Sequence, residues 1–133
     1  MIDQIADYLK SLEQFKNVPI EQLKWLVEHS NIHTYEPDEH ISKPGDMLDR
    51  MLIFLDGSIK ITINNGNRLR EIGIWEKGSV TGKLPFSRMH SSIAYLTVIE
   101  KCTILETHES LFPEIAKQYE LIEADRKSTR LNS

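Results

Sequence analysis

The sequence predicts a mainly β fold, a barrel or a double-sheet jelly roll, with helices before and after it. Turn signals recur at short intervals between residues 31 and 107, and they are Pro37-Asp38, Pro44-Gly45, Asp56-Gly57 and Asn65-Gly66. Between these turns, Ile59, Ile61 and Ile63 alternate with polar residues, which is the period of a half-buried strand. Short strands separated by such turns are typical of closed or double-sheet β architectures.

Two helices are expected within the first 30 residues. Ile5, Leu9 and Leu12 fall on one face of a helix over residues 3–12. Pro19 stands where the first turn of a second helix tolerates proline. The apolar residues after it, Ile20, Leu23, Leu26 and Val27, would form the buried face of that second helix.

Short strands are expected around residues 32–34, 40–43, 51–55, 59–63 and 68–75, the last alternating at Leu69, Ile72 and Ile74. Residues 95–99 and 103–106 are expected to form a closing hairpin around Glu100-Lys101. The strand residues predicted to lie mostly inside the roll are Ile41, Leu52, Phe54, Ile61, Ile63, Leu96, Val98 and Leu105. Helical spacing returns at Leu111, Phe112 and Ile115, and a further helix is expected to begin at Tyr119.

Composition limits the function classes. The chain has 133 residues, 40% hydrophobic and 27% charged, which is an ordinary soluble composition for one domain. The formal net charge of −4 argues against nucleic-acid binding, which needs a basic surface. With one cysteine, no membrane-length apolar run and no signal-like N-terminus, we expect a cytoplasmic protein without membrane contact.

The candidate binding site lies in residues 78–98. Gly78 and Gly82 allow positive φ angles and a close approach of the backbone to a ligand. A turn of helix beginning there would direct unpaired N–H groups at an anion. The candidate ligand-binding residues are Thr81, Gly82, Lys83, Leu84, Ser87, Arg88, Ser91 and Ser92.

The order of these motifs resembles a cyclic nucleotide-binding domain, the regulatory module of catabolite-activator-type transcription factors and of the protein kinase A regulatory subunit. After two helices come Lys43-Pro44-Gly45-Asp46, Leu55-Asp56-Gly57, Gly78…Gly82 and Leu111-Phe112. The resemblance covers residues 1–123. It implies N-terminal helices over 1–30, an eight-stranded antiparallel jelly roll over 31–107, and signal-transmitting C-terminal helices over 108–123. Residues 82–96 would be its phosphate-binding cassette.

Two departures affect the predicted ligand. The family places a glutamate after the cassette glycine to bind the ribose 2′-OH, but this chain has Lys83. Roughly nine positions later the family places an arginine on the cyclic phosphate, but this chain has Ser92, or Ser91 if the gap is one shorter. We therefore expect no cofactor and no cyclic nucleotide held in the family's manner. The site is either vestigial, with the side chains of Lys83 and Arg88 pointing to solvent, or holds a small anionic ligand weakly on N–H groups near Gly82 and Leu84, helped by Arg88.

A narrower resemblance indicates the biological setting. The phrase from Thr81 to Met89, together with His108…Leu111-Phe112-Pro113-Glu114, is similar to input domains placed ahead of bacterial sensor histidine kinases. It implies a non-enzymatic input module whose output domain is absent from the chain and which is dimeric in the full-length protein. Residues 124–133, ADRKSTRLNS, resemble a translated sequencing adapter, so we expect a non-native tail there.

Two other functions fit the sequence less well. One is a true cyclic-nucleotide-responsive regulator with an altered pocket, placed ahead of a DNA-binding domain. The other is a cupin-like metalloenzyme, which shares the jelly-roll shape. Cupin ligands usually include a paired His-x-His motif, and none of the five histidines, His29, His33, His40, His90 and His108, forms such a pair.

Overall fold

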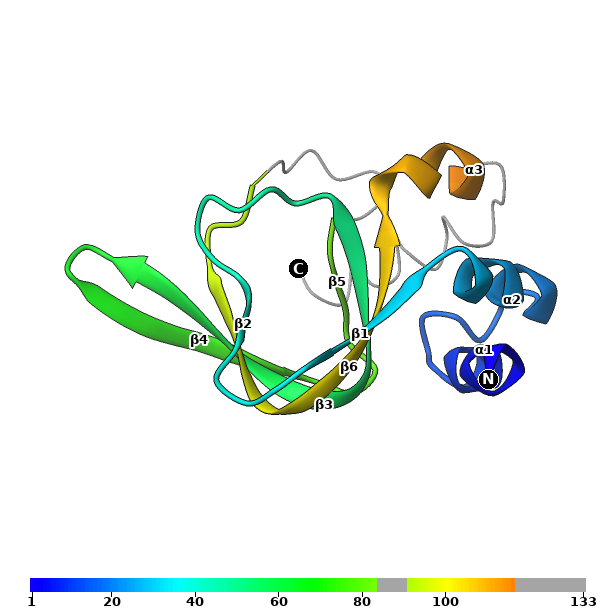
Figure 1. The fold of residues 1–133 in the computed structure, drawn as a ribbon, viewed down its shortest axis with the longest axis horizontal. Coiled ribbons are helices and arrows are strands. Elements are labelled where there is room, and N and C mark those ends of the chain that lie inside the picture. The colour runs from blue at the N-terminus through cyan, green and yellow to red at the C-terminus, as the bar shows by residue number, and fades with distance from the viewer. Residues whose placement is uncertain (84–90, 117–133) are drawn as a thin grey trace.

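The computed structural model of the chain describes residues 1–83 and 91–116 (Figure 1). Its elements follow the order helices, strands, helices that the sequence predicts. In chain order they are α1 (Ile2–Lys10), α2 (Ile20–Glu28), β1 (Asn31–Tyr35), β2 (His40–Ser42), β3 (Arg50–Asn65), β4 (Arg68–Glu76), β5 (Val80–Gly82), β6 (Tyr95–His108), the 3₁₀ turn η1 (Glu109–Leu111) and α3 (Phe112–Ala116).

One antiparallel sheet contains all six of these strands. The long strands β3 and β6 pair along most of their length, and the other strands flank them in the order β1-β6-β3-β4. β2 also pairs with β6, and β5 pairs with β3 beside residues 51–53. The sheet curls into a roll with the helices at one side (Figure 1). The mainly β jelly-roll prediction is therefore confirmed, with six strands in the described part in place of eight.

The strand count differs because two predicted breaks are bends within continuous strands. β3 runs through Asp56-Gly57, and β6 runs through Glu100-Lys101, where a hairpin was predicted. The register of the pairing between β3 and β6 shifts on both sides of Asp56 and again after Ser58, which is the pattern of β-bulges. Gly57 adopts a φ of +91°, so its bulge bends β3 while β6 bends alongside it. The predicted Glu100-Lys101 hairpin is therefore wrong.

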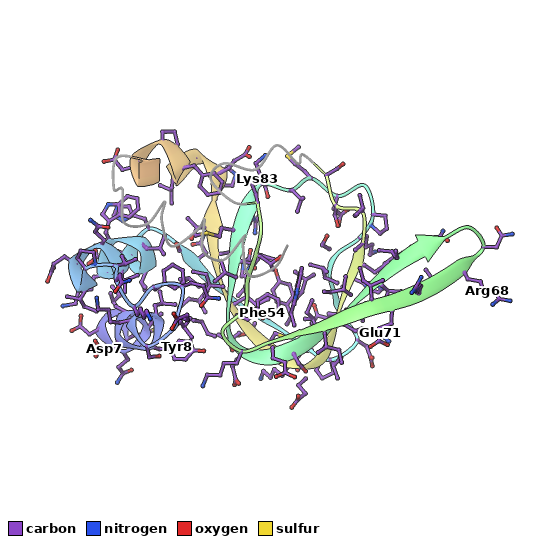
Figure 2. The ribbon with its side chains drawn as sticks, turned by 180° about the vertical axis from the view of Figure 1, so that it is seen from behind. Asp7, Tyr8, Phe54, Arg68, Glu71 and Lys83 are labelled. Carbon is purple, nitrogen blue, oxygen red and sulfur yellow. The ribbon has the colours of Figure 1, made fainter. Side chains whose placement is uncertain are left out.

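The hairpin of β3 and β4 extends away from the rest of the roll, and Arg68 lies at its free end (Figure 2). The alternation at Leu69, Ile72 and Ile74 predicted a half-buried strand, but these side chains are 66%, 52% and 51% exposed. The reason is that no element in the described part of the chain covers the outer face of this hairpin. A bulge at Ile72 also interrupts the alternation, since Gly73 pairs with Ile61 and Glu71 pairs with Thr62.

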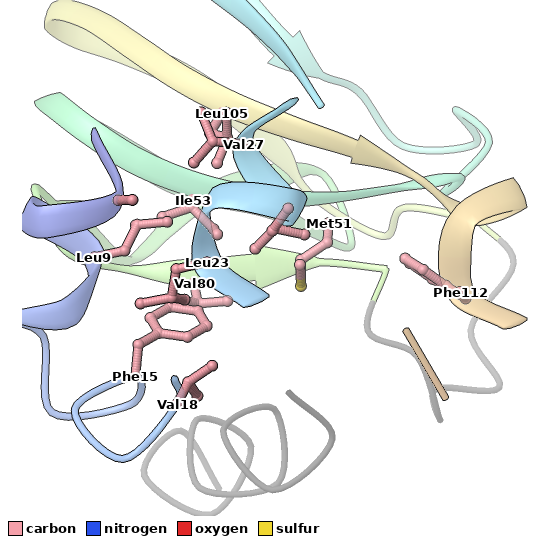
Figure 3. Close-up of a cluster of buried hydrophobic side chains, with 12 residues drawn as sticks. Leu9, Phe15, Val18, Leu23, Val27, Met51, Ile53, Val80, Leu105 and Phe112 are labelled. Carbon is pink, nitrogen blue, oxygen red and sulfur yellow. The ribbon is translucent and has the colours of Figure 1, made fainter. Parts of the chain in front are cut away.

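The apolar core forms layers on the two faces of β3 and β6. Leu52 and Phe54 point into the roll, while the alternate residues Met51 and Ile53 face the helices. Figure 3 shows the helix-facing layer, where Leu9, Phe15 and Leu23 meet strand residues. The predicted interior residues Leu52, Phe54, Ile61, Leu96, Val98 and Leu105 are buried, and Ile41 and Ile63 are partly buried. Leu105 is inside as predicted, although it faces the helices.

Phe112 fixes the start of the C-terminal helical segment to this layer. Its side chain is buried in the same cluster as Met51 and Leu105, so it packs against the helix-facing side of the sheet. The side chain of Ile115 and the helix predicted from Tyr119 lie outside the described residues, as does the tail at 124–133. In the described part, no helix is both long enough and apolar enough to cross a membrane.

Candidate functional site: the cavity of the β-roll

A cavity of about 370 Å³ opens inside the roll, beside the start of the predicted cassette. Gly82 at the end of β5 forms part of its wall, opposite strand residues that come from β1, β2, β3 and β6. Its lining residues are Tyr35, Ile41, Ser42, Asp46, Met47, Leu48, Asp49, Arg50, Leu52, Gly82, Leu96 and Glu106. A concave site with an apolar floor and a few charged groups is the usual form of a small-molecule pocket.

Gly82 lets the cassette begin close against β3. Its φ is +83°, and a Cβ added there would lie 2.5 Å from the backbone oxygen of Arg50. The next residue, Lys83, donates its backbone N–H to that same oxygen at 2.7 Å. The first predicted site residues are therefore held on the rim of the cavity by main-chain contacts. Thr81, which pairs with Leu52, is half-buried.

Lys83 is buried, with 8% of its surface exposed. The vestigial-site hypothesis expected its side chain to point to solvent, and the structure contradicts that expectation. A lysine stem can pack along apolar surface while its terminal nitrogen reaches a polar environment.

Ser92 at the far end of the cassette is buried and turned inward. Its hydroxyl donates to the Ala94 backbone oxygen at 2.9 Å and accepts the Ala94 N–H at 3.2 Å. Its backbone N–H donates to the Asp46 oxygen and its own oxygen accepts the Gly45 N–H, both at 2.8 Å. Ser91 beside it is exposed and forms a bridge with Met47. Both ends of the cassette are thus fixed to residues 45–50, while Leu84, Ser87 and Arg88 lie outside the described residues.

A buried carboxylate, Glu106, occupies the inner wall of the cavity. It is 2% exposed, and its Oε1 accepts a charge-assisted hydrogen bond from Arg50 Nη1 at 2.6 Å. Its Oε2 accepts the Tyr35 hydroxyl at 2.7 Å and lies 3.1 Å from His33 Nδ1. A buried charge needs such partners, and the three side chains supply them.

This cluster shifts the ionisation of its members. Burial and the hydrogen bond to Glu106 raise the pKa of the Tyr35 phenol well above its usual range, because both disfavour the phenolate. The hydrogen bond to Glu106 also raises the pKa of the Arg50 guanidinium, which keeps its charge. Asp49 adds a second carboxylate, 3.5 Å from Arg50 Nε and 3.5 Å from His108 Nε2.

A family model described as the cyclic nucleotide-binding domain matches residues 32–119. The chain belongs to this family. A search among curated proteins finds no match.

Solved structures share this fold at low sequence identity. The catabolite activator protein of Thermus thermophilus is 12% identical with a TM-score of 0.75, covering 90% of this chain and 56% of its own. The regulatory domain of Toxoplasma gondii PKA, solved with cAMP, is 15% identical with a TM-score of 0.81, at coverages of 98% and 49%. The regulatory subunit of a cAMP-independent PKA from Trypanosoma cruzi, bound to guanosine, is 13% identical with a TM-score of 0.79, at 94% and 44%. The chain therefore spans about half the length of these proteins.

Sequence reasoning missed four polar residues that line the cavity of this cyclic nucleotide-binding domain, namely Tyr35, Asp49, Arg50 and Glu106. One signal was available for Glu106, because Cys102, Ile104 and Glu106 fall on one strand face and only the last is charged. Asp46 behaves as predicted for a turn residue, since its side chain accepts the Lys43 N–H at 2.9 Å. In the described ranges, no three His, Cys, Asp or Glu side chains form a group that could hold a metal ion.

Proposed function

We propose that this chain is a non-catalytic sensory domain whose pocket does not hold cyclic nucleotides in the manner typical of its family. We further propose that it is the input module of a bacterial sensor histidine kinase, acts in the cytoplasm and dimerises in the full-length protein. The family assignment supports a regulatory role, and the cassette phrase from Thr81 to Met89 supports the kinase setting.

The observation that carries the pocket proposal is the arrangement of Ser92. We place the family's phosphate-binding arginine position at Ser92, or at Ser91 if the gap is one shorter, and Ser92 is buried with both of its hydroxyl contacts going to Ala94. A hydroxyl engaged in this way supplies no positive charge to a phosphate, whereas a guanidinium would form two parallel charged hydrogen bonds. Lys83 likewise replaces the carboxylate that would accept the ribose 2′-OH.

The charges of the cavity support the same proposal. Arg50, the guanidinium among its lining residues, is already paired with Glu106 at 2.6 Å. Asp46 and Asp49 line the same space, so among the described lining residues a phosphate entering it would meet three carboxylates and one engaged cation. In contrast, an uncharged ligand avoids this repulsion. The regulatory subunit of the cAMP-independent kinase, which is bound to guanosine, has the same fold, and this supports testing nucleosides beside cyclic nucleotides.

Isothermal titration of the 133-residue chain with cAMP, cGMP and guanosine tests the pocket proposal. We expect no cyclic nucleotide binding at micromolar concentration. In the variant Lys83→Glu/Ser92→Arg we expect cAMP affinity to rise by about tenfold or more, since a charged hydrogen bond is worth about 1.5–3 kcal/mol. Circular dichroism verifies that this variant folds, because both replaced residues are buried.

The control is Lys101→Glu/Ser11→Arg, which makes the same two kinds of replacement at exposed positions that do not line the cavity. Its cAMP affinity should match that of the unmodified chain. Micromolar binding of cAMP by the unmodified chain would refute the pocket proposal. The kinase proposal is tested separately by sequencing the source gene past codon 123, where we expect a dimerising helix followed by a histidine kinase core.

A further inference from the structure

His108 stands at the junction between the roll and the C-terminal helical segment formed by η1 and α3. It is the last residue of β6 and the N-cap of η1, which leads directly into α3. Its ring Nδ1 accepts the backbone N–H of Ser110 at 3.1 Å. A side chain at the N-cap holds the first turn by accepting an N–H group that has no partner within the helix. The usual residues there are asparagine, aspartate, serine and threonine, which do not change their charge near neutral pH, whereas histidine does.

The cap defines the protonation state of the ring. An imidazole nitrogen accepts a hydrogen bond only when it carries no proton, so a capping Nδ1 belongs to a neutral ring with its proton on Nε2. Nε2 lies 3.5 Å from the Asp49 carboxylate oxygen Oδ2, which suits a nitrogen that carries a proton. The two sides of the ring therefore agree on one tautomer, because Nδ1 faces a donor and Nε2 faces an acceptor.

Protonation of Nδ1 reverses the contact between His108 and Ser110. The Ser110 hydroxyl oxygen lies 3.0 Å from Nδ1, so it can accept the new ring N–H. The Ser110 backbone N–H is itself a donor, so it loses its acceptor when Nδ1 gains a proton. Two other contacts of the segment do not involve the ring, namely the burial of Phe112 and the bond from the Glu109 N–H to the Asp49 backbone oxygen at 2.7 Å. Protonation therefore loosens the first turn without removing these attachments.

The charged groups around the ring come from several elements of the described chain. Asp49 and Arg50 approach it from the start of β3, where Arg50 is the partner of position 108 in the pairing with β6. The Arg50 guanidinium is already paired with a carboxylate on β6. Glu109 in η1 and Glu114 in α3 follow the ring in the chain, and Lys83 lies beyond Arg50, on the other edge of β3. An imidazolium formed here therefore has the Asp49 carboxylate as a counter-charge beside it.

We propose that His108 is a pH-sensitive cap that controls how firmly the C-terminal helical segment is joined to the roll. Histidine changes its charge between about pH 5 and 8. At the upper end of this range the neutral ring holds the Ser110 N–H, and at the lower end the imidazolium releases that N–H and holds the Ser110 hydroxyl in its place. This device goes beyond the sensory function proposed above, and it does not depend on the ligand of the roll or on the output domain.

Amide hydrogen exchange of the 133-residue chain, measured by NMR at about pH 5 and about pH 8 and expressed as protection factors, tests the cap. We expect the Ser110 amide to be about fivefold more protected at the higher pH, the change in an equilibrium constant that a typical cap produces. Ring nitrogen shifts at the higher pH should place the proton of His108 on Nε2. His108→Asn retains a capping oxygen that does not titrate, so its protection should be the same at both pH values. His108→Ala has no capping atom and should be weakly protected at both.

The matched control is His40→Asn, which replaces another exposed histidine. The Nδ1 atom of His40 also contacts a hydroxyl, that of Thr97 at 3.0 Å, but this pair lies toward the opposite end of β6. The control should leave the pH dependence of the Ser110 amide unchanged, and circular dichroism verifies that each variant folds. The proposal is overturned by equal protection at the two pH values in the unmodified chain, by a proton on Nδ1 at the higher pH, or by a pH dependence that persists in His108→Asn.

Discussion

Replacing Gly57 by alanine tests the bend that shapes the roll. Gly57 has a φ of +91°, and a Cβ added there would lie 2.3 Å from the Lys101 backbone oxygen and 2.7 Å from the Cys102 Cα atom. Both of these atoms belong to the main chain of β6, so no side-chain rotation can relieve the contact. Gly45 is the matched control, because its φ is +90° and nothing lies within 4 Å of its added Cβ.

The expected free-energy cost differs between the two sites. Alanine in a left-handed conformation costs about 1–2 kcal/mol, and both variants incur this strain. Only Gly57→Ala also forces β3 and β6 apart, and overpacking of a closely packed site typically costs about 1–3 kcal/mol more. We therefore expect Gly45→Ala to lose about 1–2 kcal/mol and Gly57→Ala about 2–5 kcal/mol, a large share of the 5–15 kcal/mol typical of a domain.

Equilibrium urea unfolding, followed by circular dichroism and by the fluorescence of Trp25 and Trp75, measures both losses. The difference between the two variants isolates the contact with β6, since the backbone strain is common to both. Equal losses would show that β3 and β6 are not in close contact at the bend, and the description of Gly57 as a bulge that joins two strand halves would be wrong.

Two further predictions concern the Glu106 cluster. Arg50→Met should lower the free energy of unfolding by about 1.5–3 kcal/mol at pH 7, below the 3–5 kcal/mol of a fully buried pair because the Arg50 side chain is 44% exposed. Adding Glu106→Gln to that variant should recover part of the loss, and a strictly additive double variant in urea unfolding would contradict the pairing. Tyr35 has a raised pKa in the folded chain, so the folded chain retains the phenol proton at pH values where the unfolded chain has lost it. The contribution of Tyr35 to the free energy of unfolding is therefore present below about pH 10 and falls above that. Tyr35→Phe should therefore flatten the decline of stability between about pH 10 and 12 in urea titrations, and an unchanged slope would show that the phenol does not titrate with unfolding.

The sequence places the two departures of the cassette at Lys83 and at Ser92, or Ser91 if the gap is one shorter. In the structure Lys83 follows a glycine with positive φ, and the side chain of Ser92 is engaged locally. Local patterns were sufficient here because a glycine turn and its neighbours are set by residues adjacent in the chain. The burial of Lys83 could not be predicted in this way, because it depends on how closely β5 packs against β3 at Arg50.

The sequence by itself determined the fold class, the order of helices and strands and the turns at Pro37-Asp38, Pro44-Gly45 and Asn65-Gly66, since these follow from periodicity and from backbone angles that such residues permit locally. Tertiary structure alone decided three features. It determined that Asp56-Gly57 is a bend and not a turn, because a positive φ suits both and only the pairing of β3 with β6 distinguishes them. It left the outer face of β4 uncovered by the other described residues, because alternation marks an apolar face without saying what packs on it. It also assembled Tyr35, Arg50 and Glu106, which are distant in the chain and meet only because β1, β6 and β3 are neighbouring strands.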